Sequence, residues 1–158
     1  IATKFNDSAT GTFPVIVGES GLGQTTLFEH EVGTDQVNPD GSTTTVTSFI
    51  QSYDYDLQQR TRGQAYSVAG DVFLAVRRFL PDFKNLAGNA EVTLAVKRYP
   101  SDSQTTTALS PFTITTSTQK KDTRARGRFV NIKIANTDVS ESWRFGTLRI
   151  DIQPDGRR

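Results

Sequence analysis

Apolar and polar residues alternate along several short stretches of this chain, and this period of two residues is what most restricts its fold. Val92, Leu94 and Val96 alternate with polar neighbours in residues 91–98, and residues 128–134 repeat the pattern. Successive side chains of a β-strand point to opposite faces of its sheet, so the pattern indicates strands with one buried face. Strands are predicted over residues 27–32, 43–52, 71–80, 91–98, 112–116, 128–134 and 143–152.

Turn residues and one continuous apolar run complete the pattern. Asn38-Pro39-Asp40-Gly41 predicts a tight turn, because proline presets φ and glycine accepts a positive φ. The run 72–76 lacks alternation, which favours a central strand covered on both faces. We therefore expect an all-β fold, an antiparallel β-sandwich (immunoglobulin-like or jelly-roll-like) of about seven to eight strands. A closed barrel would have the same pattern.

The N-terminal part of the chain differs in composition from the rest. Residues 1–26 are rich in Gly, Ser, Thr and Asn, which predicts a flexible or extended N-terminal arm or linker end. Residues 27–158 are then the sandwich domain. The chain starts at Ile1 and contains no methionine, so we expect it to be a fragment, a processed product or the ordered part of something longer.

The amino-acid composition excludes several kinds of site. The chain has no cysteine and one histidine, His30, which excludes a disulfide framework, a thiolate zinc site and a cysteine nucleophile. A metal site built from several histidines is excluded as well. No apolar stretch has the length of a membrane helix, and no membrane anchor is expected. We expect neither a cofactor nor a metal.

Three motifs suggest catalysis or nucleotide binding, and each has a simpler interpretation. Residues 18–25 nearly spell a phosphate-binding loop, but Gln24 stands where that loop needs the positive charge of lysine. Asp54 and Asp56 could act as paired carboxylates or hold calcium, although alternate acids on a strand usually face solvent. His30 lies between two glutamates without an evident partner for catalysis. The chain is predicted not to be an enzyme.

Positive charge is concentrated at the C-terminal end. The net charge is +1, but residues 120–158 hold ten Lys or Arg against five Asp or Glu. Arg124, Arg126 and Arg128 alternate and therefore share one strand face. With Arg157 and Arg158 they are candidates for contact with a polyanion or a neighbouring subunit. The alternative is that Arg124, Arg126 and Arg128 pair with acidic residues of an adjacent strand or subunit. Trp143 is a candidate core or interface anchor.

An ordered series of motifs over residues 27–158 resembles the C-terminal end of large virion structural proteins of short-tailed phages, of the tail tubular or nozzle type. The motifs nearest the C-terminus are Arg124-Ala125-Arg126-Gly127-Arg128, Val130-Asn131-Ile132-Lys133-Ile134, Trp143-Arg144-Phe145-Gly146-Thr147-Leu148-Arg149-Ile150-Asp151 and Pro154-Asp155-Gly156-Arg157-Arg158. Those further back include Ser48-Phe49-Ile50-Gln51-Ser52, Val76-Arg77-Arg78-Phe79-Leu80-Pro81-Asp82-Phe83, Val92-Thr93-Leu94 and Arg98-Tyr99-Pro100.

The resemblance implies a structural role in the virion and a longer chain, of which this segment is the C-terminal β module. It implies a module in a tail ring or nozzle that contributes to tail assembly and DNA passage, located in the phage tail and assembled in the host cytoplasm. Its partners would be other copies of itself in a ring and neighbouring tail or portal proteins, with non-specific DNA contact in addition. The opposite charge bias of the two ends of the chain would help to set the register of such a ring.

A second function class stays open. β-Sandwiches also serve as carbohydrate-binding modules, in which exposed aromatic rings stack on sugars. The candidate rings here are Tyr53, Tyr55 and Tyr66, and the ligand would be a glycan of a host surface. Selective binding on a glycan array would favour this alternative over the structural role.

Overall fold

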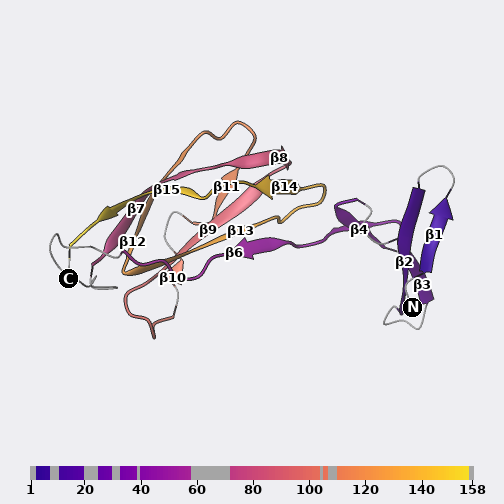
Figure 1. Ribbon diagram of the computed structural model, residues 1–158, viewed down its shortest axis with the longest axis horizontal. Coiled ribbons are helices and arrows are strands. Elements are labelled where there is room, and N and C mark those ends of the chain that lie inside the picture. The colour runs from indigo at the N-terminus through magenta and orange to yellow at the C-terminus, as the bar shows by residue number, and fades with distance from the viewer. Residues whose placement is uncertain are drawn as a thin grey trace. The chain divides into compact units, whose positions relative to one another are not determined.

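A computed structural model gives the arrangement of the strands (Figure 1). The residues it describes are 3–7, 11–19, 25–29, 33–38, 40–57, 72–103, 105–106 and 110–156. They contain strands and loops and no helix, so the all-β class is confirmed. The chain forms two compact units, Ile1–Val46 and Thr47–Arg158. The division into an arm of residues 1–26 and a sandwich of residues 27–158 stays a prediction. The boundary between the two compact units lies after Val46.

The first unit contains two small antiparallel sheets. One has the order β1 (Thr3–Asp7), β2 (Gly11–Glu19) and β3 (Thr25–Glu29). The other is the hairpin of β4 (Asp35–Val37) and β5 (Thr43–Thr45). The turn predicted between these two strands is present: the Gly41 amide donates to the Asn38 carbonyl at 2.9 Å, and Gly41 has a φ of 83°.

The second unit contains the remaining strands. They are β6 (Phe49–Gln51), β7 (Leu74–Leu80), β8 (Phe83–Ala87), β9 (Ala90–Lys97), β10 (Thr105–Thr106), β11 (Phe112–Ile114), β12 (Lys121–Gly127), β13 (Phe129–Ala135), β14 (Ser142–Phe145) and β15 (Arg149–Pro154). One sheet has the order β10-β9-β13-β6, with β11 also pairing with β9. A second has the order β12-β7-β15, and β8 pairs with β14. All of these pairs are antiparallel.

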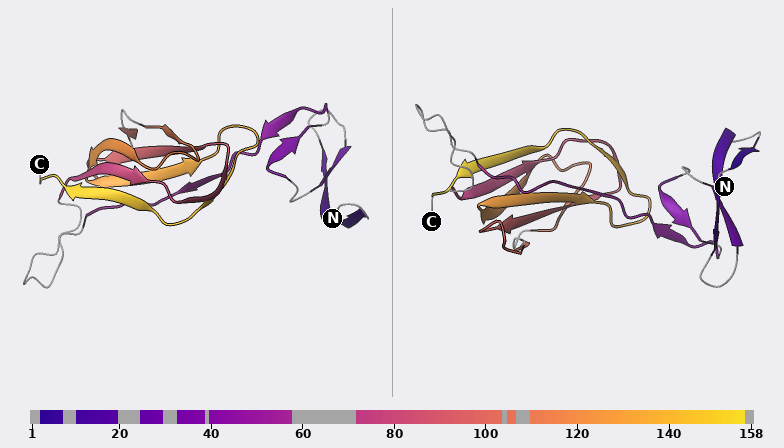
Figure 2. Two further views of the ribbon diagram at one scale, coloured as in Figure 1. Left: turned by 90° about the horizontal axis from the view of Figure 1, so that it is seen from above. Right: turned by 60° about the horizontal axis from the view of Figure 1, so that its bottom comes forward.

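The two larger sheets of the second unit pack face to face, which makes it an antiparallel β-sandwich (Figure 2). Leu74 and Val76 of β7 meet Leu94 of β9 and Ile132 of β13 in one buried cluster. The period of two residues predicts Leu94 and Ile132 as buried, and Leu74 and Val76 belong to the apolar run 72–76. The rings of Phe79 and Phe112 meet edge to face, with centroids 5.9 Å apart.

Several strand limits differ from the prediction for physical reasons. Residues 43–52 form two strands, because β5 pairs within the first unit and β6 pairs with β13 of the second. Residues 143–152 divide in the same way, since β14 pairs with β8 and β15 with β7. The strands β1, β2, β4, β8, β10 and β12 lie outside the predicted strand ranges. The predicted central strand is confirmed, since β7 lies between β12 and β15.

Candidate interaction surface

The outer face of the sheet β12-β7-β15 carries a group of arginines, which we call the arginine face. In β12, Thr123 and Ala125 are buried toward the core, whereas Arg124 and Arg126 are exposed on the opposite side. This is the alternation predicted from the sequence. Because β12 and β15 both pair with β7, the sheet adds arginines from the other two strands. Its described members are Arg77, Arg78, Arg124, Arg126 and Arg149.

A β-bulge places two consecutive arginines of β7 on this outer side. Val76 and Phe79 are both fully buried in the core, and Arg77 and Arg78 lie between them. The register with β15 shifts at this point, so one residue of β7 has no opposite partner there. An inserted residue re-aims the side chains next to it. The bulge therefore turns both Arg77 and Arg78 outward, where strict alternation would allow only one of them.

Aspartates pair with three of these arginines. Arg78 Nε lies 2.8 Å from Asp122 Oδ1, and Arg149 Nε lies 3.7 Å from Asp82 Oδ2. Arg126 forms an ion pair with Asp155, the residue that follows β15. Of the three arginines for which pairing is the predicted alternative, Arg126 forms an ion pair, and its partner Asp155 follows β15, which is not the strand next to β12. Arg77 and Arg124 are exposed and form no ion pair within the described part of the chain.

The hydrogen bond between Arg78 and Asp122 shifts the pKa of both groups. It lowers the pKa of the Asp122 carboxyl below its ordinary value of 3.8 and raises the pKa of the Arg78 guanidinium. Both side chains are largely in water, so this pair contributes little to the stability of the fold. Its effect is to hold one arginine in place on the face.

Arg128 lies at the corner where β12 turns into β13. It is half-buried, and its guanidinium lies 5.2 Å from the centre of the Phe73 ring and 5.4 Å from that of Tyr99. Arg126 approaches the same Phe73 ring at 4.5 Å. Arg126 and Arg128 therefore reach the same ring, although Arg128 follows the end of β12 and is not part of that strand. Arg157 and Arg158 lie outside the described residues.

Trp143 packs against the core from β14. It is half-buried, and its ring meets that of Phe83 edge to face, with centroids 6.0 Å apart. Phe83 in turn lies 5.3 Å from Phe145. These three rings join the β8-β14 ribbon to the rest of the second unit, which places Trp143 among the core contacts.

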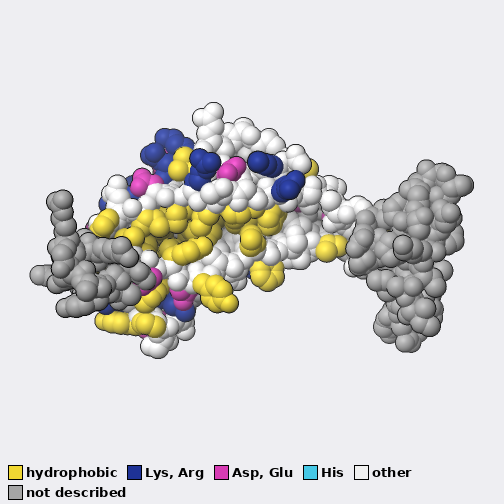
Figure 3. Space-filling view, viewed as in Figure 1, with side chains coloured by type: hydrophobic (Ala, Val, Ile, Leu, Met, Phe, Trp, Pro, Cys, Tyr) yellow, Lys and Arg dark blue, Asp and Glu magenta, His cyan; other side chains and the backbone are white. Residues whose placement is uncertain are grey.

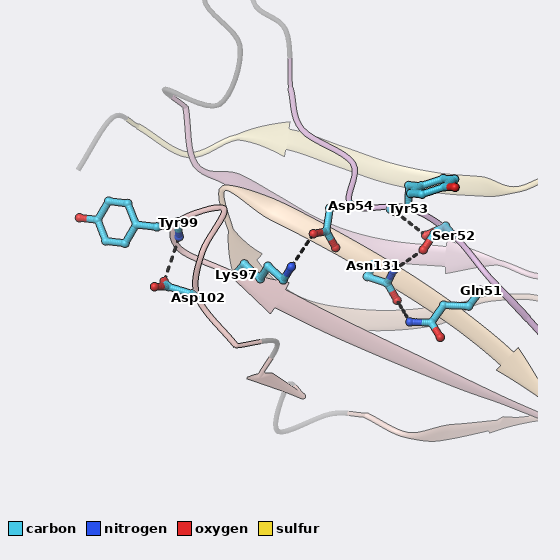
Figure 4. Close-up of polar contacts among 8 residues, drawn as sticks. All are labelled: Gln51, Ser52, Tyr53, Asp54, Lys97, Tyr99, Asp102 and Asn131. Atoms are coloured by element: carbon cyan, nitrogen blue, oxygen red, sulfur yellow. Dashed lines mark hydrogen bonds and ion pairs between the residues drawn. The ribbon is translucent and has the colours of Figure 1, made fainter.

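The outer face of the other sheet holds a polar cluster (Figure 4). The Gln51 side-chain amide donates to Asn131 Oδ1 at 3.0 Å, and Asn131 donates to the carbonyl of Ser52. Lys97 Nζ lies 2.8 Å from Asp54 Oδ2. Tyr53 is 94% exposed next to this cluster, and Tyr99 projects from its far end. Of the other predicted sugar-stacking rings, Tyr55 is 43% exposed and Tyr66 lies outside the described residues.

The structure describes only part of the residues that suggest catalysis. Asp54 forms an ion pair with Lys97, and this contact explains the position of its carboxylate without a catalytic role. His30 and residues 20–24 of the glycine-rich segment lie outside the described residues. No group of three or more candidate metal ligands occurs within the described ranges. The same ranges contain no helix with the length and apolar character needed to cross a membrane.

Sequence reasoning missed Arg77, Arg78 and Arg149 as neighbours of Arg124 and Arg126. Two adjacent charged residues inside the apolar strand 71–80 were the available signal, because they break its pattern at the bulge. Comparison of the chain with protein-family models, curated proteins and solved structures found no match. The arginine face and the cluster around Tyr53 are therefore interpreted on their chemistry alone.

Proposed function

We propose that this chain is a structural module of a phage tail ring or nozzle, without catalytic activity, that acts through contacts with other copies of itself. The observation that carries the proposal is the partial exposure of core-directed side chains on two edge strands. Ile50 of β6 is paired opposite the buried Ile134, yet it is 49% exposed. Ile150 and Ile152 of β15 are paired opposite the buried Phe79 and Val76, and both are half-exposed.

These half-exposed apolar side chains on edge strands would become buried if a second copy of the chain packed against them. Figure 3 shows a continuous band of hydrophobic side chains along one side of the second unit. Exposed apolar bands and unpaired strand edges are features that isolated proteins usually avoid and that subunit interfaces use. The resemblance to tail tubular and nozzle proteins supports a ring in the virion, next to tail or portal proteins. Non-specific contact with passing DNA is a further expectation from that resemblance.

Self-association of the chain tests the proposal. We expect native mass spectrometry and sedimentation velocity to show an oligomer of defined size that grows with protein concentration. Ile50→Lys should weaken this association by about tenfold or more, because it places a charge on an apolar contact. Val139→Lys is the matched control, since Val139 is 48% exposed but lies in a loop. A chain that stays monomeric at all concentrations contradicts the proposal.

Carbohydrate binding is the second candidate, and the exposure of Tyr53 favours it. An exposed ring beside amide and carboxylate groups is the usual chemistry of sugar recognition. Selective signals on a glycan array that Tyr53→Ala removes would support this function. Signals that survive Tyr53→Ala, or no signals at all, would speak against it.

A further inference from the structure

The two compact units of the chain carry opposite net charge. Residues 1–46 hold one lysine and six acidic residues, for a net charge of −5. Residues 47–158 hold the other 17 of 18 Lys or Arg and 11 of 17 Asp or Glu, for a net charge of +6. Charge separation on this scale steers association between oppositely charged surfaces.

The arginine face brings five arginines of the second unit onto one sheet, with Asp82, Asp122, Asp151 and Asp155 beside them. Arg77 and Arg124 are its members with no ion pair inside the described ranges. Three arginines of the face are held in position by aspartates. Arg77 and Arg124 are therefore available to a partner, and the other three arginines around them are fixed by ion pairs.

The aspartates of this face favour a protein partner over nucleic acid. Asp122 and Asp151 lie on either side of Arg78, and Asp155 lies beside Arg126. A polyphosphate backbone presents closely spaced negative charge and would be repelled by these carboxylates. A protein surface with separate acidic side chains can place them opposite Arg77 and Arg124 and avoid the aspartates.

We propose that the acidic first unit of one copy binds the arginine face of a second copy, so that the copies join head to tail. This inference rests on the proposed self-assembly and adds a charged contact to the apolar strand edges described above. A head-to-tail contact uses two different surfaces of the same chain, and it closes into a ring when the rotation between copies allows it. Separate positive and negative units on one chain meet that requirement.

Three double or triple variants of the full 158-residue chain test the contact. The face variant is Arg77→Gln/Arg124→Gln, in two exposed residues of β7 and β12. The acid variant is Asp7→Asn/Glu19→Gln/Glu29→Gln, in strands of the first unit. The control is Lys84→Gln/Arg98→Gln, which removes the same charge as the face variant from exposed residues outside the arginine face. Circular dichroism verifies the fold of each.

Sedimentation velocity at low salt should show the expected pattern. The face and acid variants each associate about tenfold more weakly than the wild type, while the control changes by less than about threefold. Mixing the two weakened variants yields a 1:1 complex, because the intact first unit of one binds the intact face of the other. That complex cannot grow further, since each copy has one defective surface. Rising salt dissociates it.

Several results would overturn the inference. Wild-type association that the face variant leaves intact would refute it while the proposed function stands. The inference would also be refuted, with the proposed function intact, if the face variant self-associates normally and loses only its retention on immobilised DNA. That result would identify the face as a nucleic-acid site. A mixture that remains monomeric would show that the contact does not form between copies. A monomeric wild type would refute the proposed function and the inference together.

Discussion

Glu141 is a buried carboxylate whose partners are backbone amides of two loops. It is 4% exposed, and its oxygens accept hydrogen bonds from the amides of Asn89, Thr137 and Asp138 at 3.2, 2.8 and 2.9 Å. A buried donor that loses its acceptor costs the full desolvation of that group. Glu141 thus holds the loop before β14 against the turn between β8 and β9.

Replacing Glu141 should destabilise the second unit. We expect Glu141→Ala to lower the free energy of unfolding by about 1–3 kcal/mol, because three amides lose their acceptor. Glu141→Gln keeps one acceptor oxygen and should cost less than Glu141→Ala. Urea denaturation followed by circular dichroism measures both. Equal stability of Glu141→Ala and the wild type would show that the loops find other acceptors.

The Asp122 carboxyl should titrate below its ordinary value because of Arg78. Its pKa is lower in the folded than in the unfolded chain, so the contribution of the pair to stability is present above the unfolded value of 3.8. That contribution is lost as the pH falls through the folded pKa. Carbon NMR of the carboxyl measures this titration.

The cause of that shift can be tested by removing its partner. Arg78→Gln should move the Asp122 pKa upward, toward 3.8. Arg144→Gln removes an exposed arginine of β14 that is not among the groups shifting Asp122, and it serves as the control. An Asp122 pKa that is the same in Arg78→Gln and the wild type would refute the role of the hydrogen bond.

The connection between β12 and β13 carries the chain from one sheet to the other. Gly127 ends β12 at this crossing, and the Arg128 amide donates to the Lys97 carbonyl at 2.9 Å. A Cβ at Gly127 would lie 2.9 Å from both that carbonyl oxygen and the Cβ of Val96. The backbone of β12 therefore approaches β9 more closely than any side chain would allow.

Gly127→Ala should push the two sheets apart at this corner. The expected loss is about 1–3 kcal/mol in the free energy of unfolding, since the contacts are backbone and a packed side chain that have little room to move. Thermal and urea denaturation measure it. Gly33→Ala is a useful comparison, because that residue has open space and only its φ of 75° opposes a side chain. A smaller loss at Gly127 than at Gly33 would contradict the crowding argument.

The strands themselves were largely predictable, and their limits were not. The period of two residues locates β9 and β13, because each buries one face against the core. It does not reveal that residues 43–52 divide between two units, since alternation continues through the break. It also misses β8, whose pairing with β14 depends on a segment far along the chain.

The core of the second unit depends on side chains that join its two sheets. Phe79 is fully buried and meets Phe112 from the opposite sheet, while its neighbour Leu80 is 38% exposed. Phe79→Ala should cost about 3–5 kcal/mol in the free energy of unfolding, whereas Leu80→Ala should cost less than about 1 kcal/mol. Urea denaturation of the two variants compares adjacent residues of one strand. Similar losses of unfolding free energy in Phe79→Ala and Leu80→Ala would contradict the placement of Phe79 in the core and of Leu80 at the surface.

The candidate surface was partly predictable for a related reason. Arg124 and Arg126 belong to one strand, so their shared exposure follows from local geometry. Arg77, Arg78 and Arg149 come from other strands, and only the pairing of β12, β7 and β15 brings them onto the same face. The ion pair of Arg126 with Asp155 has the same origin, since 29 residues separate the partners.

The sequence alone determined the all-β class, the central strand β7 and the buried positions of β9 and β13, because the two-residue repeat of a strand is local. The tertiary structure decided which strands are neighbours, where the bulge turns Arg77 and Arg78 outward and how the chain divides after Val46. Those outcomes depend on pairing between distant segments, which no local pattern encodes. The resulting arginine face and the opposite charge of the two units are the basis for the assembly proposed here.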